Sequence, residues 1–209
     1  GVTLVVALWL LPLFAVMLTS IRSNEELMAG NYWGWPQKFS LIENYTAVFE
    51  QTAMLRFFLN SLLITIPSVV GVLILSTLTG FVLSRYPFRG SNLIFALFVG
   101  GNFLPAQVMM IPVRDLMVRL GLYDTVYALI VFHIAFQTGF ATLFMRNFIA
   151  ALPGELFQAA RAEGASPYQV LRHVVVPLVR PALAALAILT FPFIWNDYFW
   201  AVVLTISDS

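Results

Sequence analysis

The side chains that could do chemistry are few in this 209-residue chain. It has two histidines, His133 and His173, one lysine, Lys38, and no cysteine, which excludes disulfides and thiolate metal sites. The phosphate-binding motif G-x-x-x-x-G-K-[ST] needs a lysine followed by Ser or Thr, but Lys38 is followed by Phe39. H-E-x-x-H and G-x-S-x-G are also absent. We therefore expect no catalytic residue, no metal site and no cofactor bound by this chain. The net charge of +1 gives no indication of a nucleic-acid partner.

Polar residues inside the apolar blocks are the next candidates. Asp197 lies within an apolar block, beside Trp195, Asn196 and Tyr198. Acidic side chains within a membrane usually face a cavity or the bundle interior, because exposure to lipid is costly. These four residues could line a solute pathway, since sugars bind aromatic faces, amides and carboxylates. The alternative is that Asp197 caps a neighbouring element. For His133, a helix-to-helix hydrogen bond is favoured over a transport role.

The polar segment LPGELFQAARAEGASPYQVLRHVVVP, residues 152–177, interrupts the apolar second half of the chain. Pro153 favours the start of a helix, and Gly164 lies where a left-handed C-cap belongs. Ser166 and Pro167 then restart a helix as N-cap and first residue. The segment is predicted to form two short helices joined by a glycine elbow.

One face of the first short helix carries small residues, at the helical spacing of Leu156, Ala159, Ala160 and Glu163. Phe157 and Arg161 lie beside this face. Such a surface fits a groove on another protein, as in helix-in-groove recognition. The alternative is an amphipathic connector on the lipid headgroups, although such helices usually carry more Lys and Arg. His173, later in the segment, is expected to be solvated or to face a partner.

The elements that must position these residues are apolar helices. The chain is 60% hydrophobic and only 10% charged, against roughly a quarter charged in soluble domains. Five blocks are near or above the roughly 20 residues that cross a bilayer: 1–21, 57–83, 93–112, 125–148 and 178–206. The first block is too long for a signal-peptide core and no cleavage site follows it, so a retained helix is expected. The prediction is an all-α, polytopic transmembrane bundle forming one domain over residues 1–209.

Basic residues set the orientation of the spans, because Lys and Arg stay on the cytoplasmic side. One set of alternating loops has six arginines and two glutamates, whereas the other has five basic and seven acidic residues. Residues 152–177 are therefore predicted to be cytoplasmic. Residues 22–56 become an external loop, with interfacial aromatics around a turn at 31–36. The odd number of spans predicts a sixth helix beyond this chain.

The polar segment resembles the cytoplasmic EAA loop of ABC-importer membrane subunits. The family pattern is Glu-Ala-Ala, three residues, Gly, nine residues and Ile-x-Leu-Pro, and here QAA at 158–160 is followed by Gly164 and VVVP at 174–177. FFLNSLLIT at 57–65, LSRYPFRG at 83–90, IPVRDLMVRLGLYDT at 111–125 and WNDYFWAVVL at 195–204 are also similar to carbohydrate and polyol permeases. The resemblance is closest to the six-helix, maltose-permease-like subunit.

This resemblance implies a permease of a binding-protein-dependent importer in the cytoplasmic (inner) membrane of a bacterium or archaeon. It implies four partners: a second permease subunit, a dimer of ATP-binding subunits that hold ATP-Mg, an external solute-binding protein, and the lipid bilayer. The residues it assigns to coupling with the ATPase are Glu155, Gln158, Ala159, Ala160, Arg161, Glu163, Gly164 and Pro177. Gln158 stands where the family has Glu, so one charge-assisted contact becomes a weaker neutral hydrogen bond.

Other classes of membrane protein stay open at this point. An ion-coupled secondary transporter would show inverted repeats and several buried ionisable groups, of which only His133 and Asp197 are present. A non-transporting scaffold leaves the loop spacing unexplained. An ABC importer for a non-sugar solute fits the same motifs, because selectivity in such systems rests largely on the external binding protein.

Overall fold

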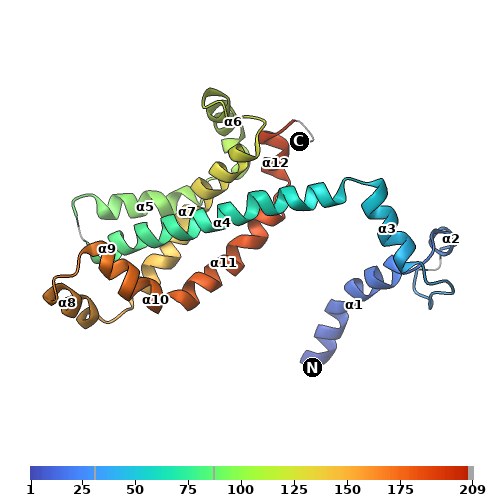
Figure 1. Ribbon diagram of the computed structural model, residues 1–209, viewed down its shortest axis with the longest axis horizontal. Coiled ribbons are helices and arrows are strands. Elements are labelled where there is room, and N and C mark those ends of the chain that lie inside the picture. The colour runs from blue at the N-terminus through green and yellow to red at the C-terminus, as the bar shows by residue number, and fades with distance from the viewer. Residues whose placement is uncertain (31, 87, 207–209) are drawn as a thin grey trace. The chain divides into compact units, whose positions relative to one another are not determined.

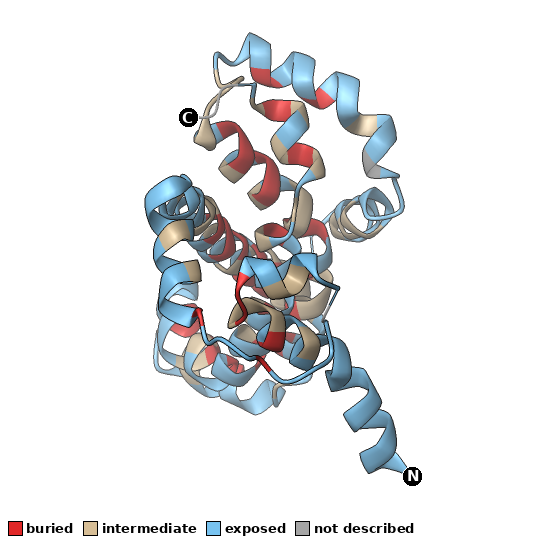
Figure 2. Ribbon diagram, turned by 90° about the vertical axis from the view of Figure 1, so that its right-hand side faces the viewer, coloured by how far each residue is buried: buried red, intermediate tan, exposed pale blue. Residues whose placement is uncertain are grey.

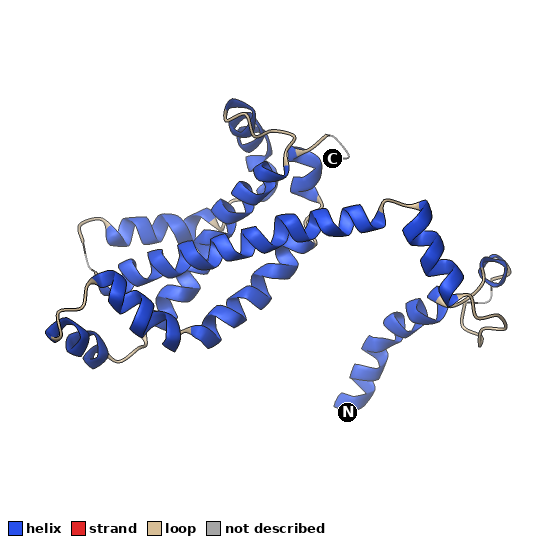
Figure 3. Cartoon of the chain, in the orientation of Figure 1, coloured by secondary structure: helices blue, strands red, loops and turns tan. Residues whose placement is uncertain are grey.

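The computed structural model describes residues 1–30, 32–86 and 88–206. Within these ranges the secondary structure is helical, apart from one antiparallel bridge between Arg22 and Phe39 (Figure 3). The chain divides into two compact units, Gly1–Leu59 and Asn60–Ser209. The prediction of an all-α fold is confirmed.

The first unit begins with a helix that packs against almost nothing in its own unit. Helix α1 (Val2–Ser20) buries only Leu18, and Figure 2 shows most of the helix in the pale blue of exposed residues. Two short helices follow, α2 (Asn24–Met28) and α3 (Leu41–Gln51). An apolar helix of 19 residues with so little burial is suited to a hydrocarbon environment.

The loop between α1 and α3 is held together by side-chain contacts to the backbone. The Glu26 carboxylate accepts hydrogen bonds from the backbone N–H groups of Gln37 and Lys38, the latter at 2.8 Å. Asn44 donates from Nδ2 to the carbonyl oxygens of Ser20 and Arg22, at 2.9 and 2.7 Å. These contacts close the loop across the Arg22–Phe39 bridge.

The aromatic segment predicted at residues 31–36 is largely exposed. Tyr32, Trp33 and Trp35 expose 54%, 66% and 73% of their surface, and Pro36 is buried. This exposure is the expected behaviour of interfacial aromatics. Asn31 lies outside the described residues.

The second unit is a bundle built around α7. Its elements are α4 (Met54–Arg85, which starts in the first unit), α5 (Ser91–Gly101), the 3-10 helix η1 (Ala106–Met109), α6 (Met110–Arg119), α7 (Val126–Ala150), α8 (Gly154–Ala162), α9 (Pro167–Val170), the π-helix η2 (Leu171–Val175), α10 (Val176–Leu178), α11 (Arg180–Trp195) and α12 (Phe199–Leu204). Helix α7 packs against α5, α11 and α12. The segment α8–α10 lies at one end of this unit, and α6 and α12 lie at the other (Figure 1).

Two apolar clusters hold the bundle at its two ends. Val72, Met145 and Leu186 are fully buried in the cluster that joins α4, α7 and α11 to the α8–α10 segment. Phe132 and Trp200 anchor the second cluster, with ring centroids 3.9 Å apart, where α6, α7 and α12 meet. Each end of α7 is thus fixed by its own cluster.

Close helix packing in the bundle involves glycines of α4 and α7. A Cβ added at Gly80 of α4 would lie 2.9 Å from the backbone nitrogen of Arg146 in α7. At Gly139 of α7 it would lie 2.8 Å from the carbonyl oxygen of Phe98 in α5. Gly100 and Gly101 of α5, by contrast, have nothing within 4 Å of such a Cβ.

Three of the five apolar blocks are single helices of spanning length, namely α1, α4 and α7. The third block stops at Gly101, and α5 at about 1.5 Å per residue covers only about 16 Å, well short of a hydrocarbon core of about 30 Å. Gly100, Gly101 and Pro105 end the helix there. The fifth block is broken at Asn196, between α11 and α12. The prediction of an unbroken span is therefore wrong for these two blocks.

Candidate functional site

The polar segment forms the predicted pair of short helices. Helix α8 follows Pro153, and Gly164 adopts the left-handed conformation with φ of 78° that favours glycine. Ser166 then caps α9: its hydroxyl accepts from Gln169 N, and the Gln169 side chain accepts from Ser166 N at 2.7 Å. This reciprocal capping box fixes the direction in which the chain leaves the elbow. The glycine elbow is confirmed.

Most of the residues predicted for coupling are exposed on this segment. Glu155, Gln158, Ala159, Arg161, Glu163, Gly164 and Pro177 are exposed, and Ala160 is half-buried. Phe157 lies on the side of α8 that it shares with Ala160 and Arg161, exposes only 6% of its surface and packs into the apolar cluster of the bundle. Helix α8 is therefore anchored through Phe157 and presents its polar and small residues outward.

The end of α4 holds the segment in place through Arg85. One Nη of its guanidinium donates to the carbonyl oxygens of Ile149 and Leu152, both at 2.6 Å, and of Ala150 at 3.3 Å. The guanidinium carbon also lies 4.0 Å from the centre of the Phe157 ring. Arg85 belongs to the cytoplasmic arginines and to the family-like segment 83–90, but this role could not be predicted because tertiary contacts leave no local signal.

Beyond the elbow the chain enters the bundle through an irregular helix. The π-helix η2 separates α9 from α10, and the axis from Pro167–Leu178 bends by 74° into α11. Pro181 lies in the first turn of α11, where its missing N–H leaves no helical bond unmade. The sequence predicted neither the π-helix nor this bend.

The predicted pathway residues lie around the break between α11 and α12. Asp197 caps α12, with Oδ1 accepting from Trp200 N at 3.3 Å, while its Oδ2 lies 3.3 Å from His133 Nε2 of α7. The side chains of His133 and Asp197 expose only 5% and 13% of their surface. The structure thus brings together the two polar groups found inside the apolar blocks.

The remaining predicted pathway residues differ in exposure. Trp195 is half-buried and stacks on Phe191 at 5.5 Å between ring centroids, whereas Asn196 and Tyr198 are exposed, Tyr198 at 79%. A small cavity of about 90 Å³ lies beside the Asp197–His133 contact. Ser61 and Thr65 of α4 join its lining, and the sequence had not singled out either residue.

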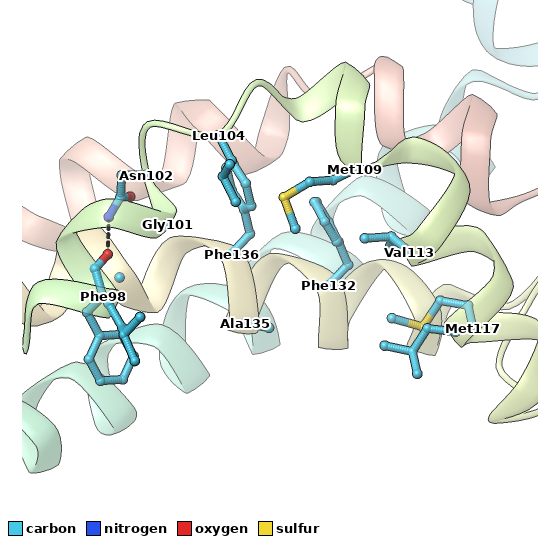
Figure 4. Close-up of a pocket in the computed structure, with 13 residues that line it drawn as sticks. Phe98, Gly101, Asn102, Leu104, Met109, Val113, Met117, Phe132, Ala135 and Phe136 are labelled. Carbon is cyan, nitrogen blue, oxygen red and sulfur yellow. Dashed lines mark hydrogen bonds between the residues drawn. The ribbon is translucent and has the colours of Figure 1, made fainter. Parts of the chain in front are cut away.

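A larger cavity lies between α5, α6 and α7 (Figure 4). It measures about 310 Å³ and is lined almost wholly by apolar side chains, with the rings of Phe132 and Phe136 on one wall. Its one amide side chain, Asn102, donates from Nδ2 to Phe98 O of its own helix at 2.6 Å. The cavity offers few groups that could bind a polar solute.

Comparison with known proteins identifies the family to which this architecture belongs. A family model described as the inner membrane component of binding-protein-dependent transport systems matches residues 52–208. The arabinooligosaccharides transport system permease protein of Halalkalibacterium halodurans is 32% identical over 95% of this chain and 71% of its own length. The osmoprotective compounds uptake permease protein of Synechocystis sp. is 31% identical over 94% of this chain and 67% of its own.

A solved structure gives the same result for the fold. One chain of a bacterial ABC transporter involved in the import of the acidic polysaccharide alginate superposes with a TM-score of 0.88 and 27% identity. The match covers 99% of this chain and 72% of that one. With its apolar helices, this chain therefore belongs to the family of multi-pass inner-membrane permease components of binding-protein-dependent ABC importers.

Proposed function

We propose that this permease carries a sugar or polyol across the inner membrane. The relatives named for arabinooligosaccharides and for osmoprotective compounds, and the structural match named for alginate, support a hydroxylated solute. The family match over three quarters of the chain argues against an ion-coupled carrier. An ABC importer for another kind of solute remains the second candidate, because the selectivity of such systems rests largely on the external binding protein.

The coupling residues dock on an ATP-binding subunit. The observation that carries this proposal is the geometry of α8, in which Phe157 is buried in the bundle while Gln158, Ala159 and Arg161 are exposed. Exposed small residues let a partner surface approach the helix closely, and Arg161, Glu155 and Glu163 can add charge-assisted hydrogen bonds at its edges. ATP-Mg binds to and is hydrolysed on that partner.

The chain connections of α8 transmit a movement of the docked segment to the bundle. Its N-terminal side follows directly on α7, and the α9–α10 segment leads into α11. A displacement of the docked segment therefore moves the ends of both helices, and the packed bundle responds by switching between two arrangements. We assign alternating access to this motion, together with a second permease subunit and a solute-binding protein on the external side.

The solute pathway passes the break between α11 and α12. Asn196 and Tyr198 are exposed there and offer an amide and an aromatic face, the groups that suit a sugar. Trp195 and Asp197 are more buried, and they shape the break from within.

The experiment is ATP-driven uptake of labelled oligosaccharides and polyols into proteoliposomes that contain the complete complex. The substitution Gly164→Asp is expected to abolish uptake while the complex still inserts into the membrane, because a φ of 78° disfavours a side chain at this position. Gly154→Asp is the matched control, since it adds the same group at a helical position with open space around it. Normal uptake in the Gly164→Asp complex would contradict the docking role of the elbow.

A further inference from the structure

Helix α4 is not adjacent in the chain to the α8–α10 segment, yet its last residue, Arg85, forms hydrogen bonds at the start of that segment. Arg85 donates to the carbonyl oxygens of Ile149, Ala150 and Leu152, which lie at the C-terminal end of α7 and just before α8. Carbonyl groups at a helix C-terminus lack partners within their own helix. The Arg85 guanidinium supplies that partner and ties α4 to the junction of α7 and α8.

The same end of α4 also contacts two successive turns of α8. The Arg85 guanidinium lies 4.0 Å over the ring of Phe157, and the Arg161 guanidinium lies 5.4 Å over the ring of Tyr86. Phe157 and Arg161 are four residues apart and so lie on one side of α8. We call these four residues, Arg85, Tyr86, Phe157 and Arg161, the clasp.

The clasp contains more than a helix cap requires. Bonding the C-terminal carbonyls of α7 needs only the guanidinium of Arg85, and any donor at that point would suffice. The two cation–π contacts are made to α8 itself, and in one the cation belongs to α4 while in the other it belongs to α8. Their reciprocal arrangement fixes both the position and the rotation of α8 relative to the end of α4.

We propose that the clasp makes α4 a third arm of the transmission, beside the covalent arms α7 and α11. Arg85 and Tyr86 are positioning residues: they pass a displacement of α8 to α4. Helix α4 then carries it to the other end of the bundle, where its Ser61 and Thr65 line the cavity beside His133 and Asp197. This inference rests on the proposed docking of α8 to an ATP-binding subunit.

The first test measures how much solute enters per ATP hydrolysed by the complete complex in proteoliposomes. Arg85→Gln removes the cation and is expected to lower this ratio about ten-fold, a typical size for a coupling effect between sites. Arg85→Lys keeps a cation with three donors and is expected to restore part of the ratio. Arg89→Gln changes an exposed arginine of the loop that follows α4; it is the matched control and should leave the ratio unchanged. Equal ratios for Arg85→Gln and Arg89→Gln would overturn the proposal.

A second pair of variants covers the case in which Arg85→Gln fails to assemble. Tyr86→Phe keeps the ring that faces Arg161, whereas Tyr86→Leu removes it. We expect the solute-to-ATP ratio to fall for Tyr86→Leu and to stay at the wild-type level for Tyr86→Phe. Equal ratios for the two variants would overturn the role of the clasp.

A third measurement separates the clasp from the proposed function. The chain has no native cysteine, so F88C and A162C can place spin labels on two exposed positions, one after α4 and one at the end of α8. Without nucleotide, the distribution of distances between the two labels should be narrow in the otherwise native complex and broad in the complex with Arg85→Gln. The complex without either cysteine serves as the background measurement. Equal widths would refute the clasp. If the widths differ while the native complex shows no ATP-driven uptake, the clasp stands as a structural contact and the proposed function fails.

Discussion

His133 Nε2 lies 3.3 Å from Asp197 Oδ2, and this contact joins the N-terminal part of α7 to the break between α11 and α12. Both side chains are largely buried, and the other carboxylate oxygen of Asp197 accepts from Trp200 N. The Asp197 carboxylate therefore caps α12 and also holds the connection between α11 and α12 against α7. Asp197 therefore has a structural role and also lies near the predicted pathway.

Removing the imidazole should leave the Asp197 carboxylate without its partner on α7. For His133→Leu we expect a loss of about 1–3 kcal/mol in stability, the usual cost of leaving a buried polar group without a partner. The measurement is the thermal unfolding of the purified complex in detergent. His133→Leu combined with Asp197→Asn should lose less than the sum of the two single variants. Strict additivity would mean that the two side chains do not interact.

Tyr198 offers a test of the pathway that leaves this contact intact. Because its side chain is 79% exposed, Tyr198→Ala should change stability by less than about 0.5 kcal/mol. If the ring contacts the solute, the concentration needed for half-maximal uptake will rise several-fold. Val202→Ala changes another exposed residue in the helix that follows, and it serves as the control for a general surface effect. An unchanged uptake curve for Tyr198→Ala would remove this residue from the pathway.

The capping box at Ser166 gives a prediction for the elbow alone. Ser166→Ala removes the acceptor for Gln169 N and should destabilise α9 by about 1 kcal/mol, whereas Ser166→Asp retains a capping oxygen. Limited proteolysis of the purified complex measures the local opening of the segment. We expect faster cleavage within residues 152–177 for Ser166→Ala than for Ser166→Asp, and equal rates would argue against a role for the cap.

At Gly80 helix α4 lies close to the backbone of α7. An added methyl group would lie 2.9 Å from the backbone nitrogen of Arg146, so Gly80→Ala must push the helices apart, at a cost of about 1–3 kcal/mol. Gly101→Ala places the same methyl group where nothing lies within 4 Å, and it should be close to neutral. Thermal unfolding compares the two variants. A Gly80→Ala complex as stable as the Gly101→Ala complex would show that the helices separate at little cost.

The elbow could be predicted from the sequence because local chemistry decides it. The positive φ at residue 164 requires glycine. Ser166 caps the backbone N–H groups in the first turn of α9, and Pro167 fits that turn; neither effect depends on tertiary contacts. Apolar composition likewise identified α4 and α7, since long helices follow from length and hydropathy.

The breaks and the clasp could not be predicted in the same way. Hydropathy continues through residues 195–206, whereas the break at Asn196 accompanies a contact between Asp197 and a distant helix. The contacts of Arg85 could not be predicted either, because its partners are backbone carbonyls and a ring brought near by folding. Gly101 did carry a signal for a helix end, which the surrounding apolar residues outweighed.

The π-helix between α9 and α10 makes the direction of the elbow tolerant of a change in chain length at this one turn. A π-turn holds about one residue more than an α-turn, whereas each α-helical residue advances the chain by about 100° around the axis. Deleting one residue within Leu171–Val175 would convert the wide turn to a regular one that still completes one revolution, so α9 would keep its direction relative to α11. The same deletion inside a regular helix would rotate everything before it by roughly 100°. The wide turn is therefore a buffer for chain length between the docking face and the bundle.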